Sequence, residues 1–323
     1  MVLIVLMKIF MRLGVLMNLS KERSRIILPF DWTMIKCLFA FLLVMVVFLI
    51  VNALTFKYAF VNAFRSYQIA LFIANLMAYS IAVLSGVHNG YIVTVIKGIG
   101  LMGTIVGFHL LMVGIIITTP FPLQDQSFYN MDLALGYDHK ILIQYMIDHD
   151  FIRNILSHMY DSLKIICFSI GFGLLFSLSI TIYYRYAAYF LISFLIGALI
   201  YYFFPSTDIA SIIPSPIFSP SAYVAIQQFD LVHNYKVITL FAIALISMPS
   251  FHTIWAMAVS FVFWKHKIMR YIAMLYTTVV IISALMLGAH FLVDILAGLV
   301  VSVCVWCFVI WLFPRRPDTF EYK

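Results

Sequence analysis

The chain has 323 residues, of which 64% are hydrophobic and only 10% are charged. This composition excludes a water-soluble globular protein, because a single core of this length could not bury so much apolar surface. The formal net charge of +7 is interpreted as a feature of membrane topology, so it gives no indication of nucleic-acid binding. We therefore predict an all-α fold, a polytopic bundle of membrane helices.

Residues 1–32 precede the first long apolar window and form an N-terminal segment. The first twenty residues combine apolar side chains with Lys8 and Arg12 but lack a small-residue cleavage site. This pattern favours a cytoplasmic, interfacial helix over a signal sequence. Translation from Met17 is an alternative that the sequence leaves open.

Windows of about 20 apolar residues, the length that crosses the hydrocarbon core of a membrane, predict about eight transmembrane helices. They lie near residues 33–55, 67–86, 91–118, 162–182, 187–204, 249–264, 268–288 and 291–313. The first three windows form an N-terminal region, 33–118, in which we expect Lys97 to extend toward the membrane surface. The second region, 119–313, contains the candidate functional residues, and residues 314–323 form a cytoplasmic tail.

Basic and acidic side chains fall at opposite ends of the predicted helices. Basic residues precede the first window, separate the sixth from the seventh, and follow the last: Lys21, Arg23, Arg25, Lys265, Lys267, Arg270, Arg315 and Arg316. Most aspartates occur in two long loops, 119–160 and 205–235. Because basic loops stay in the cytoplasm, we expect both termini to be cytoplasmic and both long loops to face outside. The expected location is a bacterial inner or plasma membrane.

The two long loops differ in character. In the first, apolar residues recur at three- and four-residue steps, which predicts one or two amphipathic helices on the outer surface. The stretch 205–223 is rich in Pro and Ser, which predicts irregular structure. Residues 237–247 are apolar but too short to cross a membrane, so they predict a short helix or a re-entrant stretch.

The sequence "PSFH" at 249–252 places a helix breaker and two polar residues at the start of an apolar window. Pro249 fits the first turn of a helix, because its missing N–H would have no intrahelical partner there. The remaining N–H groups, the helix dipole and the Ser250 hydroxyl predict an anion site near the outer membrane surface. His252 would lie beside this site as a proton donor.

A second motif, "GAHFLVDILAG" at 288–298, begins the last window. His290 and Asp294 are four residues apart and therefore share one face of a helix. A carboxylate in an apolar run needs a partner, and a bond from Asp294 would fix the tautomer of His290 and leave its other nitrogen as a nucleophile or base. By the predicted topology, His252 and His290 meet at the outer interface, where they could divide the steps of phosphoryl transfer.

These motifs resemble those of the type 2 phosphatidic-acid phosphatase superfamily, whose second and third motifs are P-S-G-H and S-R-x5-H-x3-D. The chain matches them with Phe251 at the Gly position and Ala284 at the Arg position, and the first motif, K-x6-R-P, is absent in that form. These departures, together with "MDLALGYD" at 131–138, resemble the branch that contains inositol phosphorylceramide synthases. The resemblance covers about residues 120–305.

The resemblance implies that region 119–313 is a catalytic domain of a lipid phosphatase or phosphotransferase. His290 would be the nucleophile that forms a phosphohistidine, Asp294 would orient it, and His252 would be the general acid. Ser250 would be a phosphate ligand. No cofactor or metal is expected in this mechanism.

Phosphoryl transfer needs positive charge near the equatorial oxygens, yet the motif arginines are missing. The cations predicted on the outer side are Lys236, Lys164 and Arg153, which we expect to bind substrate. The expected partner is a lipid phosphate or phospholipid in the outer leaflet, with water or a small alcohol such as inositol as acceptor. Fewer arginines favour transfer or a phosphodiester substrate. The sequence indicates no nucleic-acid partner and allows no inference about protein partners.

Other functions fit part of the pattern. His252, His290 and Asp294 could hold a divalent metal in a membrane hydrolase. His290 and Asp294 could instead form the proton relay of a transporter or flippase, although the sequence lacks the inverted repeats of many transporters. A catalytically inactive scaffold is a third alternative. The other outer histidines, including His139, are interpreted as solvated interfacial residues.

Overall fold

The computed structural model describes residues 21–57, 59–60, 66–84, 91–176, 180–218, 220–235, 237–238 and 246–314. The predictions for the first twenty residues, for most of the stretch 237–247 and for the tail from Arg315 lie outside the described residues. So does the expectation that Lys236 binds substrate.

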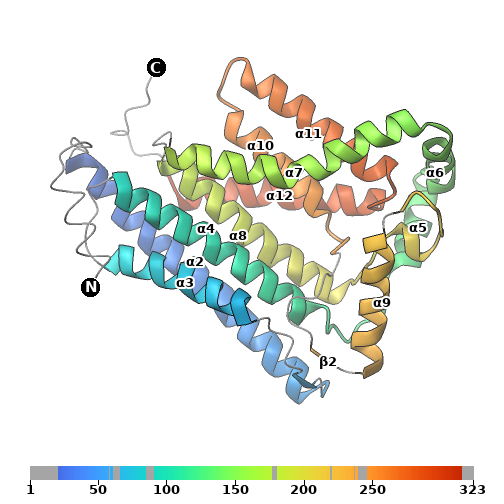
Figure 1. Ribbon diagram of the computed structural model, residues 1–323, viewed down its shortest axis with the longest axis horizontal. Coiled ribbons are helices and arrows are strands. Elements are labelled where there is room, and N and C mark those ends of the chain that lie inside the picture. Colours follow the sequence, from blue (N-terminus) through green and yellow to red (C-terminus); the bar gives the residue numbers. More distant parts are fainter. Residues whose placement is uncertain are drawn as a thin grey trace.

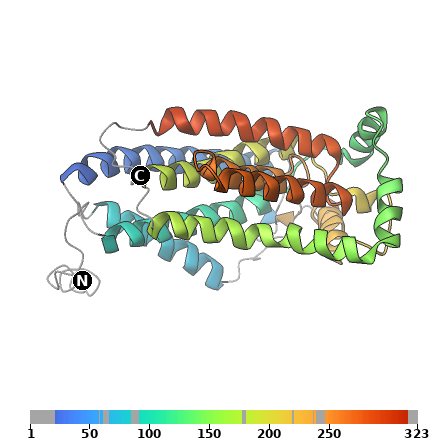
Figure 2. The same ribbon diagram turned by 90° about the horizontal axis from the view of Figure 1, so that it is seen from above.

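Long helices run side by side to form a bundle (Figures 1 and 2). The N-terminal region supplies α2 (Lys21–Leu54), α3 (Ser66–Leu84) and α4 (Tyr91–Ile116). The second region supplies α7 (Asp150–Phe176), α8 (Ile180–Phe203), α10 (Phe251–Phe263), α11 (Met269–Met286) and α12 (Leu292–Leu312). The shorter elements are α5 (Asp125–Ala134), α6 (His139–Asp148), η1 (Ile209–Ser211), α9 (Pro220–Tyr235), and a parallel pair of two-residue strands, β1 (Ala59–Phe60) and β2 (Val237–Ile238).

Within the described residues, helices occupy the apolar windows of the sequence, so the prediction of a helical bundle is confirmed. In the described part of the chain, five helices are long and apolar enough to cross a membrane: Pro29–Leu54, Ile92–Ile116, Ile180–Phe203, Met269–Met286 and Leu292–Leu312. Two further apolar helices, Ala70–Leu84 and Phe251–Phe263, are shorter. These lengths are consistent with an integral membrane protein.

The short helices gather at one end of the bundle. Helices α5, α6 and α9 lie together at the right of Figure 1, whereas the turn between α10 and α11 points toward the opposite end. The acidic loops and the basic turn at 265–270 are therefore separated along the bundle, as their charges predicted. The irregular stretch predicted at 205–223 contains only the short η1 helix and the first turn of α9.

Helix α8 is the centre of the bundle, because α2, α4, α7, α10 and α12 all pack against it. Its buried tyrosines donate hydrogen bonds to backbone carbonyls of three neighbours: Tyr183 to Gly98 of α4 (2.6 Å), Tyr186 to Cys167 of α7 (2.8 Å) and Tyr189 to Ile254 of α10 (2.7 Å). Polar groups inside a membrane must find their partners within the protein, so these hydroxyls fix the positions of neighbouring helices relative to α8.

The N-terminal helices are joined to α8 by a buried ion pair. Lys97 of α4 lies 2.6 Å from Asp31 of α2, and both side chains are almost completely buried. The hydroxyl of Tyr184 on α8 donates to the other carboxylate oxygen of Asp31. The expectation that Lys97 extends to the membrane surface is therefore wrong, because Asp31 provides a partner inside the protein.

Breaking this ion pair should destabilise the bundle. We expect Lys97→Met to leave Asp31 charged, buried and short of its partner, at a cost of roughly 3–5 kcal/mol. Thermal unfolding in detergent, compared at one heating rate, measures the effect. The double variant Asp31→Asn with Lys97→Met removes both charges and should recover most of the lost stability. A midpoint of thermal unfolding for Lys97→Met that equals the midpoint of the double variant would contradict this account.

Candidate functional site

Helix α10 begins at the polar motif, but the expectation that Pro249 lies in its first turn is wrong, because the helix starts at Phe251 and Pro249 precedes its cap. Ser250 is its N-terminal cap, and the Ser250 hydroxyl accepts a hydrogen bond from the backbone N–H of Thr253 at 3.2 Å. The Ser250 side chain is fully buried. Its hydroxyl oxygen therefore caps the helix as an acceptor, and its O–H still has the capacity to donate to a phosphate, although the side chain is closed off from the surface.

The first turn of α10 lies unusually close to α12. The N–H of Ser250 donates to the carbonyl of Asp294 at 3.0 Å, and a Cβ atom added to Gly298 would lie 2.9 Å from the carbonyl oxygen of Ser250. Phe251, at the position where the family motif has glycine, places its ring over Gly197 of α8, where a Cβ atom would lie 2.5 Å from the ring. Gly298 thus allows α10 to approach α12, and Gly197 allows Phe251 of α10 to approach α8.

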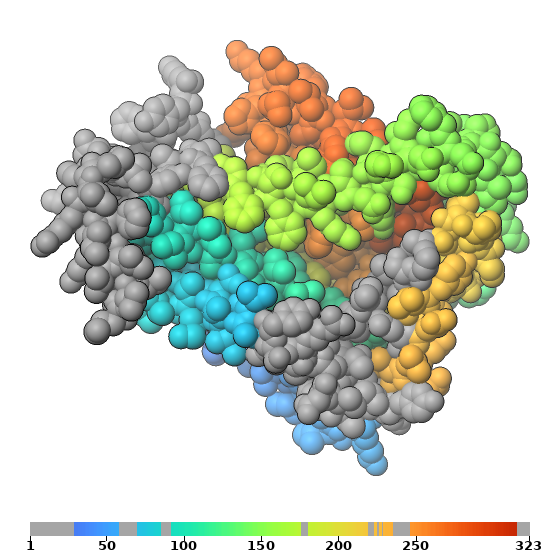
Figure 3. Space-filling model, in the orientation of Figure 1, coloured from blue at the N-terminus to red at the C-terminus, as the bar shows by residue number. Residues whose placement is uncertain are grey.

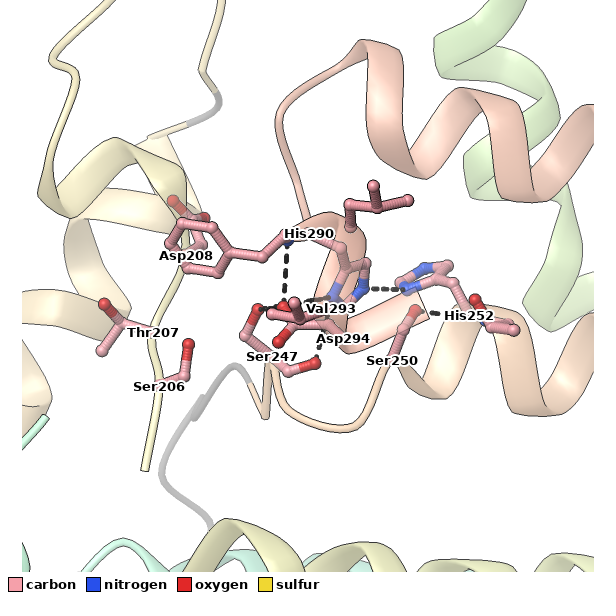
Figure 4. Close-up of polar contacts among 12 residues, drawn as sticks. Ser206, Thr207, Asp208, Ser247, Ser250, His252, His290, Val293 and Asp294 are labelled. Carbon is pink, nitrogen blue, oxygen red and sulfur yellow. Dashed lines mark hydrogen bonds and ion pairs between the residues drawn. The ribbon is translucent and has the colours of Figure 1, made fainter. Parts of the chain in front are cut away.

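The two histidines predicted to work together meet beside this contact (Figure 4). Nδ1 of His252 lies 3.3 Å from Nε2 of His290. His290 is buried, whereas His252 is partly exposed and stacks on the ring of Tyr160 from α7 at a centroid distance of 3.7 Å. The structure therefore brings residues from α7, α10 and the start of α12 to one point.

The other nitrogen of His290 is held by Ser247, which the sequence analysis did not identify. Nδ1 of His290 donates to the carbonyl of Ser247 at 3.1 Å, and the Ser247 hydroxyl donates to Asp294 Oδ2 at 2.6 Å. The distance from His290 Nδ1 to Asp294 Oδ2 is 3.7 Å. Ser247 thus mediates between imidazole and carboxylate. A carbonyl oxygen only accepts hydrogen bonds, so Nδ1 of His290 carries a proton, and in the neutral ring Nε2 is then the unprotonated nitrogen.

Asp294 also stabilises the N-terminus of α12. Its Oδ2 also accepts from the backbone N–H of Phe291 at 3.0 Å, which caps the helix. Its Oδ1 is buried and has no hydrogen-bond partner within the described residues. The carboxylate therefore adds negative charge beside His290 and fixes the chain segment that carries it.

The predicted cations lie at different distances from the histidines. Lys164 is exposed on α7, one turn after Tyr160. It is close enough to His252 for the two side chains to interact electrostatically. Arg153 is engaged at the start of α7, where it pairs with Asp150 at 2.6 Å and donates to the carbonyl of Met146 at 3.2 Å. Lys164 is therefore the described cation that the structure places near the site.

A second histidine and aspartate pair supports the start of α12. Asp132 of α5 accepts hydrogen bonds from the N–H groups of Leu292 (2.7 Å) and Val293 (3.0 Å), and its Oδ2 lies 2.7 Å from Nε2 of His139. Asp132 and His139 are almost completely buried. The interpretation of His139 as a solvated interfacial residue is therefore wrong. The motif "MDLALGYD" was noted only as part of the family resemblance, and no contact of Asp132 was predicted from it.

The loop that precedes η1 lies on the other side of His290 (Figure 4). Asp208 accepts a hydrogen bond from the N–H of Ala210, and its charge interacts with that of His290. Burial raises the pKa of the Asp208 carboxyl from 3.8 to about 6, although Ala210 and His290 act in the opposite direction. The site therefore contains a carboxyl group that titrates just below neutral pH.

The raised pKa of Asp208 predicts a change in stability with pH. The folded state binds the proton more tightly than the unfolded state, so stability should fall as pH rises from about 4 to 6, by roughly 3 kcal/mol. Asp208→Asn keeps the acceptor for Ala210 but cannot ionise, so it should melt above the wild type at pH 8 and close to it at pH 4. Asp230→Asn, at an exposed position of α9, is the matched control and should retain the wild-type pH dependence. Equal melting curves for Asp208→Asn and the wild type at pH 8 would refute this assignment.

Comparison with known proteins identifies the family. A family model described as the PAP2 superfamily matches residues 126–318, a range that begins in α5 and includes His252, His290 and Asp294. No curated protein and no solved structure matches the chain. The match covers more than half of the sequence, and members of this superfamily are phosphatases. The chain belongs to the PAP2 superfamily.

Proposed function

We propose that this protein is a membrane lipid phosphoesterase or phosphotransferase in which His290 and His252 carry out phosphoryl transfer through a phosphohistidine. One observation carries the proposal. The unprotonated Nε2 of His290 points at Nδ1 of His252, 3.3 Å away, while the Ser247 carbonyl holds the opposite nitrogen. The two rings thus meet at one point, from which, once they separate, one could attack a phosphorus atom and the other could protonate the leaving oxygen.

The reaction proceeds in two steps. Nε2 of His290 attacks phosphorus, the bond from phosphorus to the lipid oxygen breaks, and the proton of His252 passes to that oxygen. Water or an alcohol then attacks the phosphohistidine, returns a proton to His252 and releases His290. Water as acceptor gives a phosphatase, and an alcohol gives a head-group transferase.

The phosphoryl group needs more room than the present separation of the two rings. Phosphorus must come within about 3–3.5 Å of His290 Nε2, and the leaving oxygen must lie within about 3 Å of His252. His290 is buried and held by Ser247, whereas His252 is partly exposed and stacked on Tyr160. The ring of His252 is therefore the one that moves aside when substrate enters, and Tyr160 guides it.

The charges around the histidines favour a substrate with few negative charges. Asp208 and Asp294 lie beside His290, and Lys164 is the nearby cation among the described residues. A phosphomonoester dianion would meet repulsion that a phosphodiester monoanion largely avoids. This supports a phospholipid donor and head-group transfer, with the substrate entering from the outer leaflet.

A phosphoenzyme assay tests the proposal. Protein in vesicles is mixed with a lipid labelled with radioactive phosphate, quenched in base within one turnover, and separated by electrophoresis. We expect an acid-labile label on the wild type and none on His290→Ala. Asp294→Asn should lose at least about a hundredfold in turnover, because it weakens the support of the nucleophile.

The same assay separates the rival functions. If a chelator abolishes the reaction and no labelled protein is seen at any time, the protein is a metal-dependent hydrolase and the phosphohistidine mechanism is refuted. If lipid crosses the vesicle membrane together with protons and no phosphate is transferred, the protein is a transporter. His158→Ala, at an exposed position of α7, is the matched histidine control and should label as the wild type does.

The leaving group distinguishes the acid from the nucleophile. His252→Ala should reduce turnover of an alkyl phosphate ester by at least about a hundredfold. It should reduce turnover of a nitrophenyl phosphate ester far less, because a nitrophenolate leaves without being protonated. His290→Ala should lose activity toward both esters. Equal losses toward both esters in His252→Ala would remove His252 from the role of general acid.

A further inference from the structure

An apolar groove lies between the N-terminal helices and the PAP2 region. It has a volume of about 350 Å³ and is formed by α3, α4 and α7, with lining residues that include Phe72, Met102, Gly103, Phe168, Gly171 and Phe172. In Figure 3 the lime-coloured α7 lies along one side of the boundary between the two regions, and the cyan α3 and teal α4 lie along the other side. Helices α3 and α4 lie outside the range that matches the family model, whereas α7 lies within it.

One face of α7 leads from the histidines to the groove. Helical neighbours on a face follow at three- or four-residue steps, as do Tyr160, Lys164, Phe168, Gly171 and Leu175. Tyr160 stacks on His252, Lys164 acts on His252, and the last three residues line the groove. The face changes from aromatic and basic near the site to apolar farther along the helix.

The length of this face suits one leaflet of a membrane. Lys164 and Leu175 are eleven residues apart, which corresponds to about 16 Å along a helix. Half of the hydrocarbon thickness is about 15 Å. A lipid with its phosphate near Lys164 and His290 would therefore place an acyl chain alongside Phe168, Gly171 and Leu175.

The rim of the groove is open to the lipid phase. Phe168 is 50% exposed, Phe172 is 47% exposed and Leu110 of α4 is 43% exposed. Leu110 belongs to α4, a helix long and apolar enough to cross a membrane, so we expect this rim of the groove to face hydrocarbon. The acyl chain of a lipid can enter the groove sideways from the membrane without leaving an apolar environment.

We infer that the groove binds an acyl chain of the lipid whose phosphate is transferred, and thereby selects substrates by chain length. This inference rests on the proposed function for the identity of the head group. The apolar walls recognise the chain, and Lys164 at the near end complements the negative charge of the phosphate.

Two glycines of α7 provide a matched pair of variants. A Cβ atom on Gly171 would make ordinary contacts of 3.5 Å with Met102 and Tyr186, so a larger side chain would extend into the groove. A Cβ atom on Gly173 would meet nothing within 4 Å. Two residues along a helix turn the side chain by about 200°, so Gly173 lies on the face away from the groove.

Photocrosslinking tests the inference without relying on turnover. Full-length protein in phosphatidylcholine vesicles is irradiated with a phosphatidylinositol that carries a diazirine at the middle of one acyl chain, and the labelled residues are identified by mass spectrometry. We expect labelling at Phe168, Met102 and neighbours along the groove. Gly171→Leu should reduce it at least tenfold, and Gly173→Leu should label as the wild type does. Labelling spread evenly over the bundle, or unchanged in Gly171→Leu, would overturn the inference.

Turnover provides a second measurement. The ratio of kcat/KM for long-chain over six-carbon lipid phosphates should fall about tenfold in Gly171→Leu. It should fall about threefold in Phe168→Ala, which removes part of the wall without filling the groove. Active variants with an unchanged ratio would overturn chain selection. Groove labelling with no phosphate transfer from any lipid would instead refute the proposed function and leave the groove as a lipid site.

Discussion

A polar group buried inside a membrane bundle must find its partner within the protein, and this constraint shapes both the bundle and the site. The tyrosines of α8 satisfy it by donating to carbonyls of α4, α7 and α10. The same rule applies to the site, where Asp294 receives hydrogen bonds from Ser247 and Phe291. Each such bond supplies a direction as well as an energy, so the partners that satisfy Asp294 also orient the segment that carries His290.

The close contact between α10 and α12 extends this local order to the pair of histidines in the candidate site. Gly298 leaves room for the Ser250 carbonyl, and the Ser250 N–H donates to the carbonyl of Asp294. The start of α10 is thereby fixed against the turn of α12 that carries Asp294, four residues after His290. Asp132 of the short helix α5 holds the same end of α12. His252 and His290 face each other because two helix starts are fastened to one another, and not because the two side chains attract.

The helices and the histidine pair could be predicted because each depends on patterns within a short stretch of sequence. Apolar windows gave the bundle, and basic clusters gave the separation of its two ends. The spacing of His290 and Asp294 identified one half of the site. Ser247 and Tyr160 could not be found in this way, because Ser247 acts through its backbone carbonyl and Tyr160 meets His252 only after α7 packs against α10. The same limit explains Lys97, whose partner Asp31 lies 66 residues earlier in the chain.

The departures from the family motifs are packed into the protein and do not leave vacant positions. Ala284 stands where the motif has arginine, and it is fully buried in α11, so a guanidinium would have to displace its neighbours. Phe251 stands where the motif has glycine, and its ring fills the space above Gly197. The interior has therefore exchanged a cation for apolar contacts, while the carboxylates of Asp208 and Asp294 remain beside His290. A site with this balance of charge loses attraction for a phosphate dianion and must obtain binding energy elsewhere. If the groove along α7 binds the lipid chain as we infer, it would supply that energy, and recognition would rest more on the hydrocarbon than on the phosphate.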